Sequence, residues 1–205
     1  MKKIKFVYFD VGGVAIKDFS DTNKWEEMWS GAKIGTDKWE KIFERFDVFE
    51  DEVTKGRQVD DFLLILKNEL KIKMPDDFSI LKVMVEMFEK NKGIERIAQD
   101  CGKKYRIGLL TNMYPGMLEM IKERELLPKV KWDAIVDSSV VGLRKPDEEI
   151  YERAEREAGV KGEEILFIDN MAKNLVMAEK RGWETFLYNS ADYEQSNKEL
   201  REFLG

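Results

Sequence analysis

Four short polar clusters in this sequence each follow an apolar run with the composition of a buried strand. The clusters are Asp10, Thr111-Asn112, the loop from Ser138 to Lys145, and Asp169-Asn170. Asp10 and Asp169 supply carboxylate oxygens, which are ligands that Mg²⁺ accepts. Thr111 supplies a hydroxyl, and Lys145 supplies a cation. A carboxylate, a divalent metal, a hydroxyl and a lysine are the groups that phosphoryl transfer requires.

The residue types that are missing narrow the chemistry further. The 205 residues include no histidine and one cysteine, Cys101. Catalysis by Ser-His-Asp or Cys-His groups and zinc binding by histidine are therefore excluded, and proton transfer must use carboxylates, lysine, tyrosine or metal-bound water. A single cysteine cannot form a disulfide within the chain, so we expect a cytoplasmic protein.

The overall composition is that of a globular protein. Hydrophobic residues make up 43% of the chain and charged residues 37%, with a net charge of −6. An acidic chain is a poor match for a phosphate backbone, so we expect no nucleic-acid partner. We also expect no membrane partner, because no apolar run approaches 18 residues. The basic start Met1-Lys2-Lys3 precedes an apolar run that stops at Asp10, too soon for a signal peptide.

The hydrophobic pattern changes twice along the chain. Residues 4–9 predict a first strand, and strands alternate with helices again from about residue 92. The further strands are expected at 105–110, 134–138, 165–168 and 185–188. Between these two parts, residues 17–91 carry apolar side chains at helical spacing, as in about four helices. Their tryptophans, Trp25, Trp29 and Trp39, are expected to pack in the interior of this segment; lining a substrate pocket is the alternative.

Strand–helix alternation with apolar strands predicts an α/β fold: a doubly wound, Rossmann-like parallel sheet covered on both faces. Residues 1–16 and 92–205 would form this core domain, and residues 17–91 an inserted, four-helix-type cap domain. Ligands of such sheets bind beyond the carboxyl ends of the strands. The four polar clusters, far apart in sequence, are therefore expected to meet at one edge of the sheet.

Four segments make the sequence resemble the haloacid dehalogenase-like (HAD) hydrolase superfamily. They are FDVGGV at 9–14, LLTN at 109–112, GLRKPDEEIY at 142–151 and FIDNMAKN at 167–174, and they occur in the order typical of that superfamily. The position of the helical segment is similar to that of the members with a helical cap (subfamily I). The first motif, Asp-x-Gly, resembles the subgroup that includes sugar-1-phosphate phosphatases.

The resemblance implies a role for each matching residue. Asp10 would be the nucleophile and would form an aspartyl-phosphate. Lys145 would bridge Asp10 and the phosphoryl group as a catalytic and substrate-binding residue. Thr111 and the backbone N–H of Asn112 would bind the phosphoryl oxygens.

The same resemblance implies a Mg²⁺ cofactor. Asp10, the backbone carbonyl of Gly12, Asp169 and Asn170 would hold the ion. Asn174 would support the last of the four motifs. An acid is common at the position of Asn170, so this site carries one negative charge fewer than usual.

Gly12 also departs from the superfamily, whose first motif is commonly Asp-x-Asp. The second aspartate of that motif protonates the leaving group and then activates water. Losing an acid–base group costs about 10²- to 10⁴-fold in rate. Three explanations are open. The substrate could carry a good leaving group, such as an anomeric or acyl phosphate. A carboxylate such as Asp18 or Asp21 could substitute, or turnover could be weak or absent.

The sequence therefore predicts a Mg²⁺-dependent phosphatase acting on a small phosphorylated metabolite, with a sugar phosphate as the expected substrate. One alternative is a 2-haloacid dehalogenase-type hydrolase, whose displacement at carbon needs no metal; Asp169 as a metal ligand argues against it. The other is a binding or scaffold protein with weak catalysis, which Gly12 and Asn170 favour. We expect a monomer or a homodimer.

Overall fold

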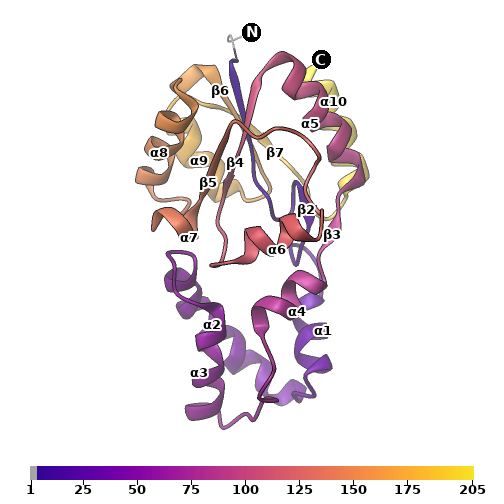
Figure 1. The fold of residues 1–205 in the computed structure, drawn as a ribbon, viewed down its shortest axis with the longest axis vertical. Coiled ribbons are helices and arrows are strands. Elements are labelled where there is room, and N and C mark those ends of the chain that lie inside the picture. The colour runs from indigo at the N-terminus through magenta and orange to yellow at the C-terminus, as the bar shows by residue number, and fades with distance from the viewer. Residues whose placement is uncertain (1–3) are drawn as a thin grey trace.

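The computed structural model describes residues 4–205, so the predicted basic N-terminus lies outside the described residues. Its centre is a five-stranded sheet in the order β5-β4-β1-β6-β7, with every neighbouring pair parallel (Figure 1). The strands are β1 (Phe6–Phe9), β4 (Arg106–Thr111), β5 (Ala134–Asp137), β6 (Ile165–Asp169) and β7 (Glu184–Leu187). All five predicted strands are present, with ends shifted by one or two residues.

Strand β1 explains why both faces of the sheet are covered. Successive strand side chains point to opposite faces, and all four residues of β1 are fully buried. Val7 and Phe9 belong to one hydrophobic cluster, and Phe6 and Tyr8 to another. Helices α5 (Lys92–Lys104), α6 (Met117–Glu123) and α10 (Tyr193–Leu204) contribute to the first cluster. Helices α8 (Glu148–Ala158) and α9 (Ala172–Lys180) contribute to the second. The predicted doubly wound α/β fold is confirmed.

The helices around the sheet follow the strands in alternation, as the sequence indicated. They are α5 (Lys92–Lys104), α6 (Met117–Glu123), α7 (Ser138–Val141), α8 (Glu148–Ala158), α9 (Ala172–Lys180) and α10 (Tyr193–Leu204). Helix α8 ends before Gly159, whose φ of +66° is a left-handed conformation that glycine adopts readily.

The helical segment lies at one end of the sheet, below it in Figure 1. Its helices are α1 (Lys24–Gly31), α2 (Trp39–Val53), α3 (Phe62–Asn68) and α4 (Ile80–Glu86). The chain enters this segment through β2 (Ile16–Lys17) and returns through β3 (Glu89–Lys90), which pair antiparallel. The four expected helices are present; the division into domains at 17 and 91 stays a prediction.

Some elements of the fold have no counterpart in the sequence prediction. Residues 138–141, expected to lie in a loop, form the short helix α7, whose start is capped by the carboxylate of Asp137. Helix α10 has few apolar residues, but its start is capped because the Asp192 carboxylate accepts a hydrogen bond from the backbone N–H of Gln195, at 3.0 Å. In the sequence, Asp192 as a capping residue was the signal that could have predicted this helix. Strands β2 and β3 have two residues each, which is too short to show a periodic pattern.

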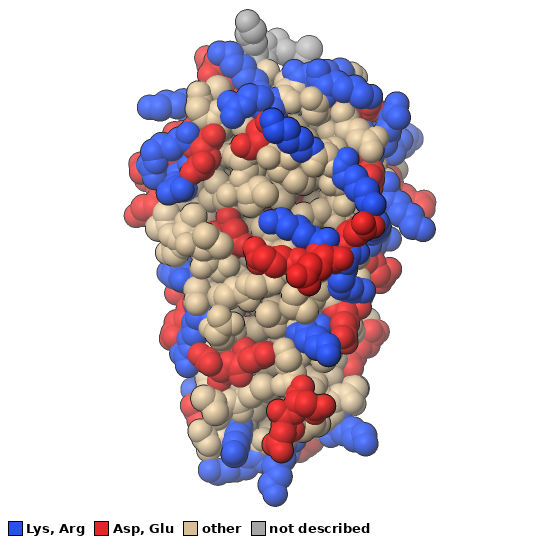
Figure 2. All heavy atoms as spheres, viewed as in Figure 1, with Lys and Arg blue, Asp and Glu red and all other residues tan. Residues whose placement is uncertain are grey.

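The surface mixes charges of both signs. Figure 2 shows lysine and arginine interspersed with aspartate and glutamate over the face in view. Exposed pairs such as Arg153 and Glu157, 2.6 Å apart one helical turn from each other, each contribute little to stability. Within residues 4–205, none of the helices combines the length and apolar composition that a membrane span requires.

Gly108, in the middle of β4, tests how tightly the sheet packs. A Cβ atom there would lie 2.7 Å from the carbonyl oxygen of Ala134 and 2.8 Å from the ring of Tyr8. We expect Gly108→Ala to destabilise the fold by about 1–3 kcal/mol, because neither the backbone nor the packed ring can move freely.

Urea unfolding measures the effect, and Gly102→Ala is the matched control. Gly102 lies in α5, where an added Cβ would meet only Ile107, at an ordinary 3.5 Å. This control should be neutral or stabilising by up to about 1 kcal/mol. Equal unfolding free energies for the two variants would contradict the packing argument.

Candidate active site

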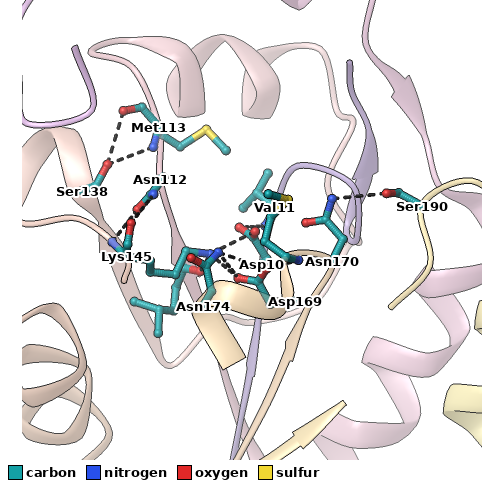
Figure 3. A network of polar contacts seen from close by, with 12 residues as sticks. Asp10, Val11, Asn112, Met113, Ser138, Lys145, Asp169, Asn170, Asn174 and Ser190 are labelled. Atoms are coloured by element: carbon teal, nitrogen blue, oxygen red, sulfur yellow. Dashed lines mark hydrogen bonds and ion pairs between the residues drawn. The ribbon is translucent and has the colours of Figure 1, made fainter. Parts of the chain in front are cut away.

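The predicted residues meet at the carboxyl edge of the sheet (Figure 3). Asp10 directly follows β1, and Thr111 and Asp169 end the two neighbouring strands, β4 and β6. Lys145 reaches the same edge from the loop between α7 and α8. All four side chains are buried; Thr111 and Asp169 are fully so. The convergence expected from parallel strands is therefore present in the structure.

The ammonium group of Lys145 lies between the two carboxylates. Its Nζ is 2.9 Å from Asp10 Oδ2 and 2.6 Å from Asp169 Oδ2, and it donates to the carbonyl oxygen of Leu110 at 3.1 Å. All three donor positions of the ammonium group thus have an acceptor. Two carboxylates and one ammonium leave a net charge of −1.

Burial and the neighbouring charges shift the pKa of Asp10 and that of Lys145. Burial raises the pKa of Asp10 to about 7; Lys145 opposes that shift, and the neighbouring Asp169 adds to it. Burial alone would lower the pKa of Lys145, but the two carboxylates outweigh it and raise that pKa. Lys145 therefore stays protonated at neutral pH, as a bridging cation must.

Asp169 is held by further hydrogen bonds. The side-chain amide of Asn174 donates to both carboxylate oxygens, at 3.1 and 3.0 Å, and the backbone N–H of Met171 donates to Oδ1 at 2.7 Å. The backbone carbonyl oxygen of Asn174 accepts a hydrogen bond from the hydroxyl of Tyr151, at 2.7 Å. Asn174 thus makes the supporting contact expected of it.

The side chain of Asn112 has a structural task that the sequence did not indicate. Its Oδ1 accepts from the backbone N–H of Lys145 at 2.8 Å, and its Nδ2 donates to the carbonyl oxygen of Lys145 at 3.0 Å. This pair of bonds fixes the loop that carries the lysine. Ser138 fixes the neighbouring loop: its Oγ accepts from the N–H of Met113 at 3.0 Å. A polar side chain just beyond a strand end was the only sequence signal for either residue.

Thr111 and Asn170 differ in how their side chains are engaged. The Thr111 hydroxyl lies close enough to Asp10 to lower its pKa, but it makes no hydrogen bond of normal geometry among the described residues. A buried hydroxyl of this kind is available to a ligand. The amide of Asn170 donates to Ser190 Oγ at 3.2 Å, and that hydroxyl donates to Asp21. The Asn170 amide nitrogen therefore points toward the loop after β7.

A cavity of about 280 Å³ separates this edge from the helical segment. Asp10, Gly12 and Lys145 line it from the sheet side. Trp25, Glu50, Thr54, Met84 and Phe88 line it from the helical segment.

Of the three tryptophans, Trp25 lines the cavity while also packing against Phe19 and Phe46. Trp29 is fully buried, and Trp39 packs against the hydrophobic interior. Interior packing is thus the main role of these residues, as expected, and Trp25 contacts the cavity as well.

Two polar contacts join the helical segment to the sheet beside the cavity. The hydroxyl of Tyr114 donates to Glu50 Oε1 at 2.6 Å, and Arg144 Nη1 is 2.9 Å from Asp51 Oδ1. Burial and the Glu50 carboxylate both raise the pKa of Tyr114, so its hydroxyl keeps the proton that it donates. Burial also raises the pKa of Asp18, another residue of the lining.

The donors at the sheet edge suit a hard cation. Within the described part of the chain, no cluster of three or more acidic, cysteine or histidine side chains has metal-binding geometry. Mg²⁺ does not require one, because it binds through one or two carboxylates and keeps several waters. Asp10 and Asp169 supply two carboxylates with a residual negative charge, so the residues present fit this ion.

The family model of haloacid dehalogenase-like hydrolases matches residues 4–182. With the fold and the buried Asp-Lys-Asp arrangement described above, the chain belongs to this family of hydrolases. The predicted superfamily is thereby confirmed; the helical-cap subfamily and the likeness to sugar-1-phosphate phosphatases stay predictions. A search of curated proteins finds no match.

Solved structures share the fold. A predicted HAD-like family hydrolase from Porphyromonas gingivalis is 21% identical, with a TM-score of 0.78 and 98% of each chain covered. A HAD family enzyme from Bacteroides thetaiotaomicron, in complex with magnesium and inorganic phosphate, is 21% identical, with a TM-score of 0.75, covering 92% of this chain and 96% of that one. The L-2-haloacid dehalogenase from Xanthobacter autotrophicus is 17% identical, with a TM-score of 0.65, covering 90% and 77%.

Removing the bridging cation should destabilise the protein. Lys145→Met leaves two buried carboxylates without their shared partner, so we expect a loss of about 3–5 kcal/mol in the free energy of unfolding. Urea unfolding at neutral pH provides the measurement. Lys173→Met, an exposed lysine of the same cavity lining, is the control and should stay within about 0.5 kcal/mol of the wild type. A similar small change for Lys145→Met would refute the bridging role.

The raised pKa of Asp10 predicts a pH dependence of stability. The folded pKa of about 7 lies above the ordinary value of 3.8, so between these pH values the folded state binds more protons than the unfolded state. Asp10 therefore lowers the stability of the metal-free protein progressively as the pH rises from about 4 to 7. Asp10→Asn removes this effect, so the variant should gain stability over the wild type across that window. Urea unfolding in EDTA at several pH values measures the difference, and a difference that does not change with pH would contradict the prediction.

Proposed function

We propose that this hydrolase is a Mg²⁺-dependent phosphatase that acts on a small phosphorylated metabolite through an aspartyl-phosphate on Asp10. The observation that carries the proposal is the contact of Lys145 with both Asp10 and Asp169 beside the cavity. A nucleophilic carboxylate needs a nearby cation to approach a phosphoryl dianion, because the two negative charges repel each other. The second carboxylate, Asp169, adds a negatively charged oxygen ligand for a metal ion.

In this proposal Asp10 attacks phosphorus, and Lys145 offsets the charge of the attacking and equatorial oxygens. The Thr111 hydroxyl and the backbone N–H of Asn112 bind phosphoryl oxygens. Asp10, the carbonyl of Gly12, Asp169 and Asn170 are the proposed ligands of Mg²⁺. When bound, the ion supplies positive charge to the phosphoryl group.

The cavity supports a small, partly polar substrate. Its volume of about 280 Å³ is at the lower end for ligand pockets. Trp25, Met84 and Phe88 give it an apolar wall, while Glu50 and Arg144 add polar groups. The Nε of Arg144 is buried and has no hydrogen-bond partner among the described residues, so it can donate to a substrate oxygen. A sugar phosphate combines apolar C–H faces with hydroxyls and is the substrate class that we propose.

Phosphate chemistry is favoured over displacement of halide. Attack on carbon in a haloacid requires no metal, whereas Asp10 and Asp169 together offer carboxylate ligands for one. The Bacteroides thetaiotaomicron enzyme with the same fold was crystallised with magnesium and inorganic phosphate. That finding supports the proposal by analogy of fold.

Phosphate release from a panel of aldose 1-phosphates, aldose 6-phosphates and acetyl phosphate, with Mg²⁺ and with EDTA, tests the proposal. We expect turnover only with Mg²⁺ and a loss on the order of 10⁴-fold in Asp10→Asn, because the nucleophile is removed. Halide release from 2-chloropropionate in EDTA would instead establish a dehalogenase. Inactivity of the folded wild type on the whole panel would favour a binding protein, and unchanged activity of Asp10→Asn would exclude Asp10 as the nucleophile.

A further inference from the structure

Because Gly12 has no side chain, the carboxylate of Asp18 occupies the space beside it. After β1 the chain folds back on itself: the backbone N–H of Ala15 bonds to the carbonyl of Asp10 at 3.3 Å, and that of Ile16 to the carbonyl of Val11 at 3.0 Å. This turn brings the linker into the helical segment alongside Gly12. A Cβ atom on Gly12 would lie 2.3 Å from Asp18 Oδ2 and 3.1 Å from its Cγ. The carboxylate of Asp18 therefore fills the space in which a side chain at position 12 would begin.

The carboxylate of Asp18 has a fixed orientation. Its Oδ1 accepts a hydrogen bond from the backbone N–H of Ser20 at 2.9 Å, while Oδ2 is the oxygen that lies against Gly12. Asp18 lines the cavity together with Asp10 and Lys145. One carboxylate oxygen is thus anchored, and the other faces the region beside the nucleophile.

The other acidic candidates are engaged elsewhere. Asp21 accepts a hydrogen bond from the hydroxyl of Ser190 and is not part of the cavity lining. Glu50 accepts from the hydroxyl of Tyr114, on the helical side of the cavity. Among the described acidic residues of the lining, Asp18 is the one next to the main chain that follows Asp10.

We propose that Asp18 is the general acid and base of this site, in place of the side chain that Gly12 lacks. The inference rests on the proposed phosphatase function. In the first step Asp10 forms a bond to phosphorus, the bond from phosphorus to the leaving-group oxygen breaks, and the protonated Asp18 gives its proton to that oxygen. In the second step water attacks phosphorus, its proton passes to the Asp18 carboxylate, and the bond from phosphorus to Asp10 breaks. Inorganic phosphate leaves, and both aspartates return to their starting states.

This role predicts a dependence on the leaving group. An alcohol leaves poorly as an alkoxide and needs a proton, whereas acetate or p-nitrophenolate leaves without one. Asp18→Asn should therefore lower turnover of an aldose 6-phosphate by about 10²- to 10⁴-fold. Formation of the phosphorylated enzyme from acetyl phosphate should change less than about tenfold. The intermediate should then accumulate, because the base that activates water is missing.

Rapid-quench measurement of phosphorylated enzyme and of released phosphate, with Mg²⁺ present, follows both steps. Asp76→Asn, at an exposed aspartate of the helical segment outside the cavity lining, is the control and should behave like the wild type. Wild-type turnover of the aldose phosphate by Asp18→Asn would overturn the proposal. Equal losses in the rate of enzyme phosphorylation by the aldose phosphate and by acetyl phosphate would overturn it as well. Absence of both phosphorylated enzyme and released phosphate in the wild type would instead refute the phosphatase function itself, so the two failures are distinguishable.

Transferring the carboxylate from position 18 to position 12 provides a second test. Gly12 does not have a left-handed φ, so its backbone accepts other residues once the space is vacated. The double variant Asp18→Gly, Gly12→Asp should turn over the aldose phosphate at least tenfold faster than Asp18→Gly alone. Gly12→Asp alone should lower the thermal stability, because two side chains then compete for one space. No recovery in a double variant that folds like the wild type would overturn the proposal.

Discussion

The ammonium group of Lys145, held between the carboxylates of Asp10 and Asp169, is the interaction on which the rest of the site depends. Two buried carboxylates at adjacent strand ends would repel each other strongly without it. Burial of the cation is tolerated because each of its hydrogens has an acceptor, the third being the carbonyl of Leu110. Asn112 fixes the backbone on both sides of the lysine, so the position of the charge is set by the fold.

The sheet makes this arrangement possible. Strand β1 is central, with β4 on one side and β6 on the other, so its end is flanked by two parallel neighbours. Groups that follow these three strands lie within one small region, although they are far apart along the chain. The central strands β1 and β6 are mostly apolar, and the one buried hydroxyl of β1, on Tyr8, donates to the carbonyl oxygen of Ala154 at 2.8 Å. The other polar groups gather where the strands stop.

The helical segment completes the site by covering the ends of the strands. Its link to the sheet is short: β2 and β3 pair next to each other, so the segment leaves and returns at one place (Figure 1). Glu50 and Asp51 of α2 contact Tyr114 and Arg144 of the sheet side, which brings the helical residues of the cavity over Asp10. The linker that follows β2 also carries Asp18 to the space beside Gly12. The missing side chain at Gly12 is thus matched by the carboxylate of Asp18, six residues later.

The sequence alone determined the alternation of strands and helices, the helical segment after the first strand, and the placement of Asp10, Thr111, Lys145 and Asp169 at one edge. These features follow from local periodicity and from the geometry of parallel sheets, in which strand ends meet whatever their separation in sequence. Helix α10 and the strands β2 and β3 were missed, because the helix is polar and the strands have two residues each.

Only the tertiary structure decided which side chains touch. The path of the loops decides that Asn112 bonds to the backbone of Lys145 and that Asn170 bonds to Ser190. It also decides that Asp18, and not Asp21, lies beside Gly12. Loop paths are set by contacts between distant segments and leave no periodic trace in the sequence. The pattern of residue types therefore predicts which groups gather at the sheet edge, and the folded chain determines which of them are neighbours.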